Sequence, residues 1–365
     1  MQRGLGSYLD KQFSRKIVFF NFFYSLVMIC YHANAEVHFA NVTSSGSLAD
    51  CVMSGVNQVF TGQSGTYFFM MLSAFLLYRD IAPGKMADKV KRRIKTLLVP
   101  WVLWNIIGLA ANHPFRRGVK EIVGSYVMSR FCEQLWFVEA LLLFLFLLPV
   151  FVRVLRIRIV GELVVAFLFV VAYLGFPGLR MLPVFPSEKA FNEIVRMLVH
   201  LPVYSLGAYL GLNWTEAVVQ ETYRSKYRWS VVVAVLVVVV SYFPAGNFLC
   251  HTCFTLRSAA LWVICSKSFF MFEPAWWMQL SFYVYAIHNF ILYLTGKCIR
   301  LSGIFAKQYA SQTVSVGFAL LWRICMAAAA FGLALCSAVV LIKITPKFYE
   351  LLSGGRVPGR YQDRR

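Results

Sequence analysis

The sequence predicts an all-α integral membrane protein, and three observations support this prediction. Of the 365 residues, 59% are hydrophobic and 14% are charged, whereas a soluble domain carries about 45–50% apolar and roughly 25% charged residues. The mean hydropathy is +0.64. Ten apolar stretches are long enough to cross a bilayer, which takes about 17–25 residues. Together these features exclude a soluble enzyme, a disordered regulator and a secreted disulfide scaffold.

The ten predicted membrane-spanning helices follow one another along most of the chain. They lie at residues 17–34, 60–78, 96–112, 134–152, 159–176, 192–212, 229–244, 249–266, 278–296 and 314–342. No internal repeat and no appended soluble domain interrupts them. We therefore predict one polytopic membrane domain over residues 1–350. A basic, disordered cytoplasmic tail is predicted for residues 351–365, where Gly354, Gly355 and Pro358 occur.

The distribution of basic residues predicts the orientation in the membrane. Lys and Arg number 36, against 16 Asp and Glu, for a net charge of +20. If the N-terminus is cytoplasmic, the inner segments carry 24 basic residues and the outer loops carry 9. This asymmetry obeys the positive-inside rule, so both termini are predicted to be cytoplasmic. The charge favours contact with anionic membrane lipids, and nucleic acid is not an expected partner.

A cleaved signal peptide is an alternative interpretation of the N-terminus. Residues 1–16 are basic, 17–31 are apolar, and Ala33-Asn34-Ala35 fits a small-x-small cleavage site. Cleavage would leave an odd number of spans and an external N-terminus. The nine cysteines are scattered, and the pair at Cys250 and Cys253 has no second ligand pair at zinc spacing. No metal site is predicted.

Ionisable residues inside membrane spans are costly unless they are paired or hydrated, so each is a candidate functional residue. His32 lies 16 residues beyond Lys16, which at 1.5 Å per residue is about 24 Å across a core roughly 30 Å thick. Four more residues are predicted to reach a similar depth: Glu139, Arg196, His200 and Arg257. The coincidence predicts a polar layer in the outer third of the membrane.

Each of these residues also has a structural interpretation. His32 can be an interfacial histidine, and Glu139 can simply neutralise an arginine. Arg196 can extend its head group outward, and His288 in the ninth span can be a hydrogen-bonded packing residue. Arg323 in the tenth span has no assigned role.

The predicted cytoplasmic loop 79–95 is strongly basic. It carries seven basic residues and two acids and ends in the sequence KVKRRIK at Lys95. Such a loop satisfies the positive-inside rule and contacts lipid head groups. It is also suited to a polyanionic cytosolic ligand, because guanidinium groups bind phosphate bidentately.

Five segments in this order resemble the acyltransferase 3 family of mostly bacterial membrane O-acyltransferases. They are FNFFYSLVMICYH at 20–32, YFFMMLSAFLLY at 67–78, KRRIKTLLVPWVLW at 91–104, LWFVEALLL at 135–143 and SFYVYAIHNFIL at 281–292. The resemblance covers residues 15 to about 340. One departure is Ala74, which stands where the family usually has glycine.

The resemblance implies transfer of an acyl group, with acetyl expected first, from cytosolic acyl-CoA to a hydroxyl of a cell-envelope glycan or lipid-linked acceptor. Acyl-CoA is then a co-substrate, and no permanently bound cofactor is implied. His32 matches the family's essential histidine. The positions associated with the CoA phosphates are Arg92 and Arg93, with Lys95 and Lys91 beside them. The family's arginine pair is often separated by one residue, and here lysines keep that spacing.

The predicted mechanism gives His32 the role of general base, with Glu139 orienting its ring. Arg257, Arg196 or His288 would contact the oxyanion or the acceptor. A multi-pass transporter or flippase for a polar or lipid-linked substrate is the alternative, since it also explains charges within the membrane. Its usual signature of broken helices in two matched halves is missing. A non-catalytic scaffold is a third interpretation.

Overall fold

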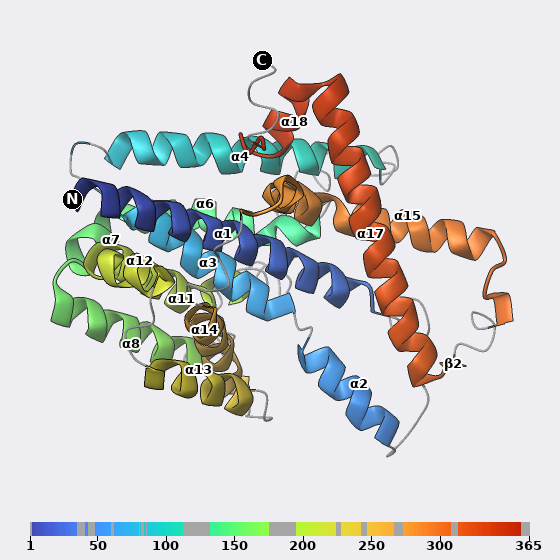
Figure 1. Ribbon diagram of the computed structural model, residues 1–365, viewed down its shortest axis with the longest axis horizontal. Helices are drawn as coiled ribbons and strands as arrows, with labels where there is room; N and C mark the ends of the chain where they lie inside the picture. The colour runs from blue at the N-terminus through green and yellow to red at the C-terminus, as the bar shows by residue number, and fades with distance from the viewer. Residues whose placement is uncertain are drawn as a thin grey trace, which may run out of the picture. The chain divides into compact units, whose positions relative to one another are not determined.

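The computed structural model describes residues 2–34, 41–42, 48–59, 62–79, 81, 84, 86–111, 132–174, 195–223, 228–241, 247–265, 273–307 and 313–358. These residues are almost entirely helical (Figure 1). The exception is a two-residue parallel pairing of β1 (Asn41–Val42) with β2 (Thr313–Val314). The prediction of an all-α fold is confirmed.

The chain divides into two compact units. Unit 1 comprises Met1–Lys16 and Thr66–Glu273, and unit 2 comprises Ile17–Gly65 and Pro274–Arg365. Unit 1 contains the start of α1 (Gln2–His32), most of α3 (Gly62–Tyr78), α4 (Met86–Ala111), α6 (Trp136–Phe144), α7 (Leu148–Val154), α8 (Arg158–Leu174), α11 (Leu201–Asn213), α12 (Thr215–Tyr223), α13 (Arg228–Val240) and α14 (Asn247–Ile264). Unit 2 contains the rest of α1, α2 (Leu48–Val59), α15 (Ser281–Leu301), α17 (Val316–Ile344) and α18 (Pro346–Leu352). Short 3₁₀ turns η4 (Glu133–Leu135), η5 (Leu145–Leu147) and η7 (Trp276–Leu280) precede α6, α7 and α15.

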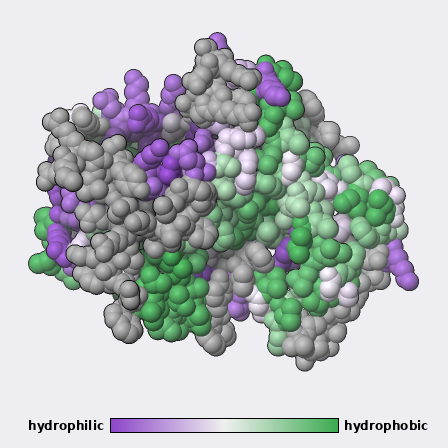
Figure 2. Space-filling view, viewed as in Figure 1, coloured by the Kyte–Doolittle hydropathy of each residue, from purple (hydrophilic) through white to green (hydrophobic). Residues whose placement is uncertain are grey.

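Helical residues occur within each of the ten predicted stretches. Within the part of the chain that the structure describes, five helical stretches are individually long and apolar enough to cross a bilayer. They are Asp10–His32, Met86–Ala111, Glu133–Val154, Val195–Asn213 and Val316–Ile344. Apolar side chains also cover outward faces, and Figure 2 shows such a surface over α13, to which Val232, Val233, Leu236, Val239 and Val240 contribute. A soluble monomer rarely exposes so much contiguous apolar surface, so these faces are suited to lipid.

Helix directions within each unit agree with alternate crossing of the membrane. In unit 1, Arg93 of α4 contacts Ser73 of α3, and Lys89 donates to the carbonyl of Leu77, so the two helices are antiparallel. In contrast, α11 runs parallel to α3, as the second and sixth spans should.

Close approach between α3 and α11 depends on two glycines one turn apart. A Cβ atom on Gly207 would lie 2.1 Å from the carbonyl oxygen of Met71, and one on Gly211 would lie 2.7 Å from that of Phe75. This spacing is the Gly-x-x-x-Gly arrangement, which lets two backbones in a membrane pack directly together. The same added atom on Gly207 would lie 3.0 Å from the Cβ of Ala74. Gly207 therefore leaves room for the alanine by which this chain departs from the family pattern.

Two features of the structure were not expected. α2 lies in the predicted connection 35–59, and η5 interrupts the helix predicted over 134–152. In the segment predicted as the tail, the structure describes residues as far as Pro358, and α18 ends at Leu352. There Leu352 and Ser353 are buried, and the guanidinium of Arg356 lies 4.4 Å from the ring centroid of Phe282.

Candidate active site

His32, the last residue of α1, lies beside His288 of α15 within unit 2. The centroids of the two imidazole rings are 5.2 Å apart, and the ring planes are tilted by 44°. The sequence identified both histidines as candidates but did not predict that they are neighbours. The structure thus brings together residues that are 256 positions apart.

A second contact between α1 and α15 lies two helical turns before the histidines. The Ser25 hydroxyl donates to the Asn21 carbonyl at 2.7 Å, and its Oγ also lies 3.3 Å from the carbonyl oxygen of Ser281. His32 and His288 each lie seven residues further along their helices, which is two helical turns. The two helices therefore run parallel in register, as the first and ninth spans should.

The environments of the two histidines differ. His288 is fully buried, whereas His32 is half-buried at the helix end. The Nδ1 atom of His288 lies 2.5 Å from the carbonyl oxygen of Tyr285. A carbonyl oxygen can only accept, so this nitrogen carries the hydrogen. The Nε2 atom of His288 is buried and has no hydrogen-bond partner among the described residues.

Arg323 of α17, for which the sequence analysis predicts no role, belongs to the same unit. It is 4% exposed, and its Nη2 donates to Oδ1 of Asn57 in α2 at 2.6 Å. The general signal of an ionisable residue within a span marks Arg323, but the sequence offers nothing that links it to Asn57.

Glu139 lies half-buried in the first turn of α6, in unit 1. Its predicted role as the residue that orients His32 involves the other unit and stays a prediction.

Arg196 and His200 form part of an aromatic cluster in unit 1. The guanidinium of Arg196 lies 4.9 Å from the ring centroid of Trp136. The His200 ring lies against Trp136 and Tyr67, with centroid distances of 4.9 and 4.6 Å. One helical turn separates Arg196 from His200, and Nδ1 of His200 lies 2.8 Å from the Arg196 carbonyl oxygen.

Arg257 is 3% exposed and is held within the α13–α14 hairpin. Its Nε donates to Oγ of Ser241 at 2.9 Å, and its Nη2 donates to the Ser241 carbonyl at 2.5 Å. Both contacts fix the chain just beyond α13 against α14, so they are structural.

The basic segment at the start of α4 has two kinds of side chain. Lys91, Arg92 and Lys95 are exposed. Arg93 is half-buried and donates to the Oγ and carbonyl of Ser73 at 3.4 and 3.2 Å. Three of the four predicted phosphate-binding residues thus face outward, and the fourth joins α4 to α3.

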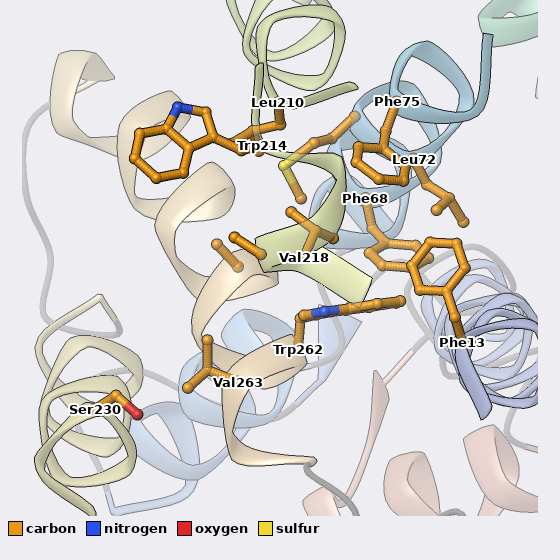
Figure 3. A pocket seen from close by; sticks show the side chains of 13 residues that line it. Phe13, Phe68, Leu72, Phe75, Leu210, Trp214, Val218, Ser230, Trp262 and Val263 are labelled. Atoms are coloured by element: carbon orange, nitrogen blue, oxygen red, sulfur yellow. The ribbon is translucent and has the colours of Figure 1, made fainter. Parts of the chain in front are cut away.

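Unit 1 also contains an apolar cavity of about 410 Å³. Figure 3 shows aromatic rings of Phe13, Phe68, Phe75 and Trp262 around it, from α1, α3 and α14. Its volume falls in the range of ligand pockets, about 300–1,000 Å³. Among the described residues that line it, none is charged and none is a histidine. The cavity therefore suits an alkyl chain and offers neither a general base nor a phosphate site.

No group of three or more histidine, cysteine, aspartate or glutamate side chains able to hold a metal ion occurs in the described part of the chain.

Comparison with known proteins gives one match. Residues 22–343 match the acyltransferase domain of the acyltransferase 3 type, which covers most of the chain and both units. No curated protein and no solved structure matches the chain. The matched region includes the His32–His288 pair and the basic segment of α4. The chain therefore belongs to the acyltransferase 3 family and is a multi-pass membrane acyltransferase.

Proposed function

We propose that this enzyme transfers an acetyl group from cytosolic acetyl-CoA to a hydroxyl of a cell-envelope glycan or a lipid-linked precursor. The observation that carries the proposal is the position of His32. It matches the family's essential histidine, and it lies half-buried at the end of α1 beside a second imidazole. A half-buried base is shielded from bulk water and still reachable by a substrate.

In the proposed reaction, the neutral ring of His32 takes the proton of the acceptor hydroxyl as its oxygen attacks the thioester carbonyl. The carbon–sulfur bond breaks when the tetrahedral intermediate collapses, and the proton on His32 passes to the CoA sulfur. The products are the O-acyl ester and free CoA. A positioned general base of this kind contributes about 10²–10⁴-fold to the rate.

The donor is proposed to bind through its phosphates to the exposed cations of α4: Lys91, Arg92 and Lys95. Exposed cations at the start of a membrane helix attract a polyanionic nucleotide from solution. This placement requires that the start of α4 faces the cytoplasm. It therefore belongs with the proposed topology of ten spans, both termini cytoplasmic, in the inner membrane.

Three further residues have proposed supporting roles. Glu139 would stabilise the imidazolium of His32 by its charge. Arg196 would contact an anionic acceptor or the developing oxyanion, because its head group is only partly enclosed by Trp136. For Arg257 the contacts to Ser241 favour a structural role.

The test is release of CoA thiol and formation of the ester by the purified protein in lipid nanodiscs. Wild-type protein should consume acetyl-CoA slowly in water and faster with an envelope glycan fraction. Mass spectrometry of glycans from cells with and without the gene should differ by one acetyl group per modified unit. Identical glycans together with no thiol release would contradict the proposal.

A further inference from the structure

The buried His288 has a chemical role beside His32 that the family assignment does not supply. We propose that His288 is a positioning residue that accepts a hydrogen bond from His32 through Nε2 and so selects the tautomer and orientation of the base. This inference rests on the proposed function of His32.

The first step of the argument is the tautomer of His288. Its Nδ1 faces the carbonyl oxygen of Tyr285 at 2.5 Å and must donate. A neutral imidazole that donates through Nδ1 presents a lone pair at Nε2. His288 is therefore an acceptor toward whatever lies on its Nε2 side.

The second step concerns the missing partner of that lone pair. A buried polar atom without a hydrogen-bond partner is destabilising, and Nε2 of His288 has none among the described residues. The neighbouring rings described around His288 are those of His32 and Tyr285, with centroids 5.2 and 5.5 Å away. Only His32 offers a ring N–H. Rotation of its ring about Cβ–Cγ can bring that group toward Nε2, and catalytic hydrogen bonds are often long before substrate binds.

The third step is what the bond does for catalysis. When His32 donates one ring N–H to His288, its other nitrogen holds a lone pair in a fixed direction. That nitrogen takes the acceptor proton, and the resulting imidazolium keeps the same bond in a charge-assisted form. His288 stays neutral throughout, and the proton leaves with the CoA sulfur.

Both histidines belong to helices rather than to loops. Ser25 and Ser281 of the same two helices also approach each other, two turns before the histidines. A base placed by helices is held more accurately than one placed by loops. A misplacement of about 1 Å typically costs about 10²-fold in rate.

Two substitutions of similar polarity separate positioning from packing. Gln at position 288 places an amide oxygen near the position of Nε2, so His288→Gln should keep kcat within about fivefold of wild type. Asn reaches only the position of Nδ1, so His288→Asn keeps a donor for Tyr285 but lacks the acceptor. His288→Asn should lower kcat by about 10²-fold with KM for acetyl-CoA nearly unchanged.

A double-mutant cycle tests whether His288 acts through His32. The variant His32→Ala should lose activity strongly, and adding His288→Asn should lower it by less than about twofold more, because interacting residues are non-additive. Equal kcat for His288→Asn and wild type, or full additivity in the cycle, would overturn the inference while leaving wild-type acyl transfer intact. Absence of transfer by the wild type would instead overturn the proposed function. Thermal unfolding of each variant checks that the comparison uses folded protein.

Discussion

At the scale of single residues, His32 of α1 and the neighbouring His288 of α15 have different environments. His32 is partly open to a substrate, whereas His288 is enclosed and already fixed by the Tyr285 carbonyl. A general base must be accessible to the substrate, whereas a residue that positions it must have a fixed orientation. The unequal burial of His32 and His288 is therefore consistent with the two proposed roles.

Replacing His32 tests the general base directly. His32→Ala should reduce acyl transfer by at least about 10²-fold, because no other group then accepts the hydroxyl proton. Binding of acyl-CoA, measured by calorimetry, should be retained, since the α4 cations are unchanged. Near-normal turnover by this variant would remove His32 from the mechanism.

Replacing Glu139 separates electrostatic support from structural pairing. If Glu139 supports His32 by its charge, as proposed, Glu139→Gln should fold and turn over more slowly. Acyl transfer measured beside thermal stability checks this. A destabilised variant with full specific activity would assign Glu139 to structure.

The sequence was sufficient to identify each histidine, because a titratable side chain inside an apolar stretch is conspicuous. It could not pair them. Ser25 and His32, like Ser281 and His288, are seven residues apart, and this shared spacing is visible only after α1 and α15 are known to be adjacent. Arg323 had the same conspicuous position but no sequence feature that suggested its contact with Asn57.

At the scale of helices, the first turns of α4 have one face toward α3 and an exposed basic face. Mutations on the two faces should therefore affect different properties, stability on the first and donor binding on the second. Arg92→Ala should raise KM for acyl-CoA by about fivefold, the equivalent of an exposed ion pair of about 1 kcal/mol. The effect should shrink at high salt, because exposed charges are screened. Steady-state kinetics at two ionic strengths measure it, and an unchanged KM would limit the segment to a topological role.

Arg93→Ala is the matched variant on the other face. It should lower the free energy of unfolding by about 1–2 kcal/mol, through loss of its hydrogen bonds to Ser73. Its KM for acyl-CoA should change less than that of Arg92→Ala. The reverse pattern would show that Arg93 binds the donor.

The packing of α11 on α3 is predicted to be sensitive to a single methyl group. Gly207→Ala should destabilise the protein by about 3 kcal/mol, because its Cβ would overlap the Met71 carbonyl. Gly332→Ala in α17 is the control, since no atom lies within 4 Å of the added Cβ. The control should stabilise by about 0.4–1 kcal/mol through helix propensity. Thermal unfolding in detergent compares the two, and equal stability would contradict the close-packing interpretation.

The length of apolar stretches predicted where helices lie, but not their interruptions. α2 has only 12 residues and is too short to be recognised as a span. η5 interrupts a stretch whose apolar composition is continuous, so hydropathy carried no sign of it. The contact of α3 with α11 depends on the absence of side chains at Gly207 and Gly211, which hydropathy also does not register.

For the whole molecule, the central expectation is the orientation of the helices across the membrane. Cys298, exposed near the end of α15, lies at a predicted outer end. A variant that retains only this cysteine should react with an impermeant thiol reagent in intact cells. A cysteine introduced by Lys347→Cys, at an exposed and predicted inner position, should react only after permeabilisation. The opposite labelling would reverse the topology.

The contact between α1 and α15 also has a consequence for biosynthesis. Its two halves are 256 residues apart, so α1 is made first and stays without its partner until the ninth helix has left the ribosome. During that interval His32 has no imidazole beside it. If His288 positions the base as proposed, a chain truncated before α15 would carry His32 without its partner and should transfer acyl groups as slowly as His288→Asn. Synthesis of α15 would then be the step that completes the site.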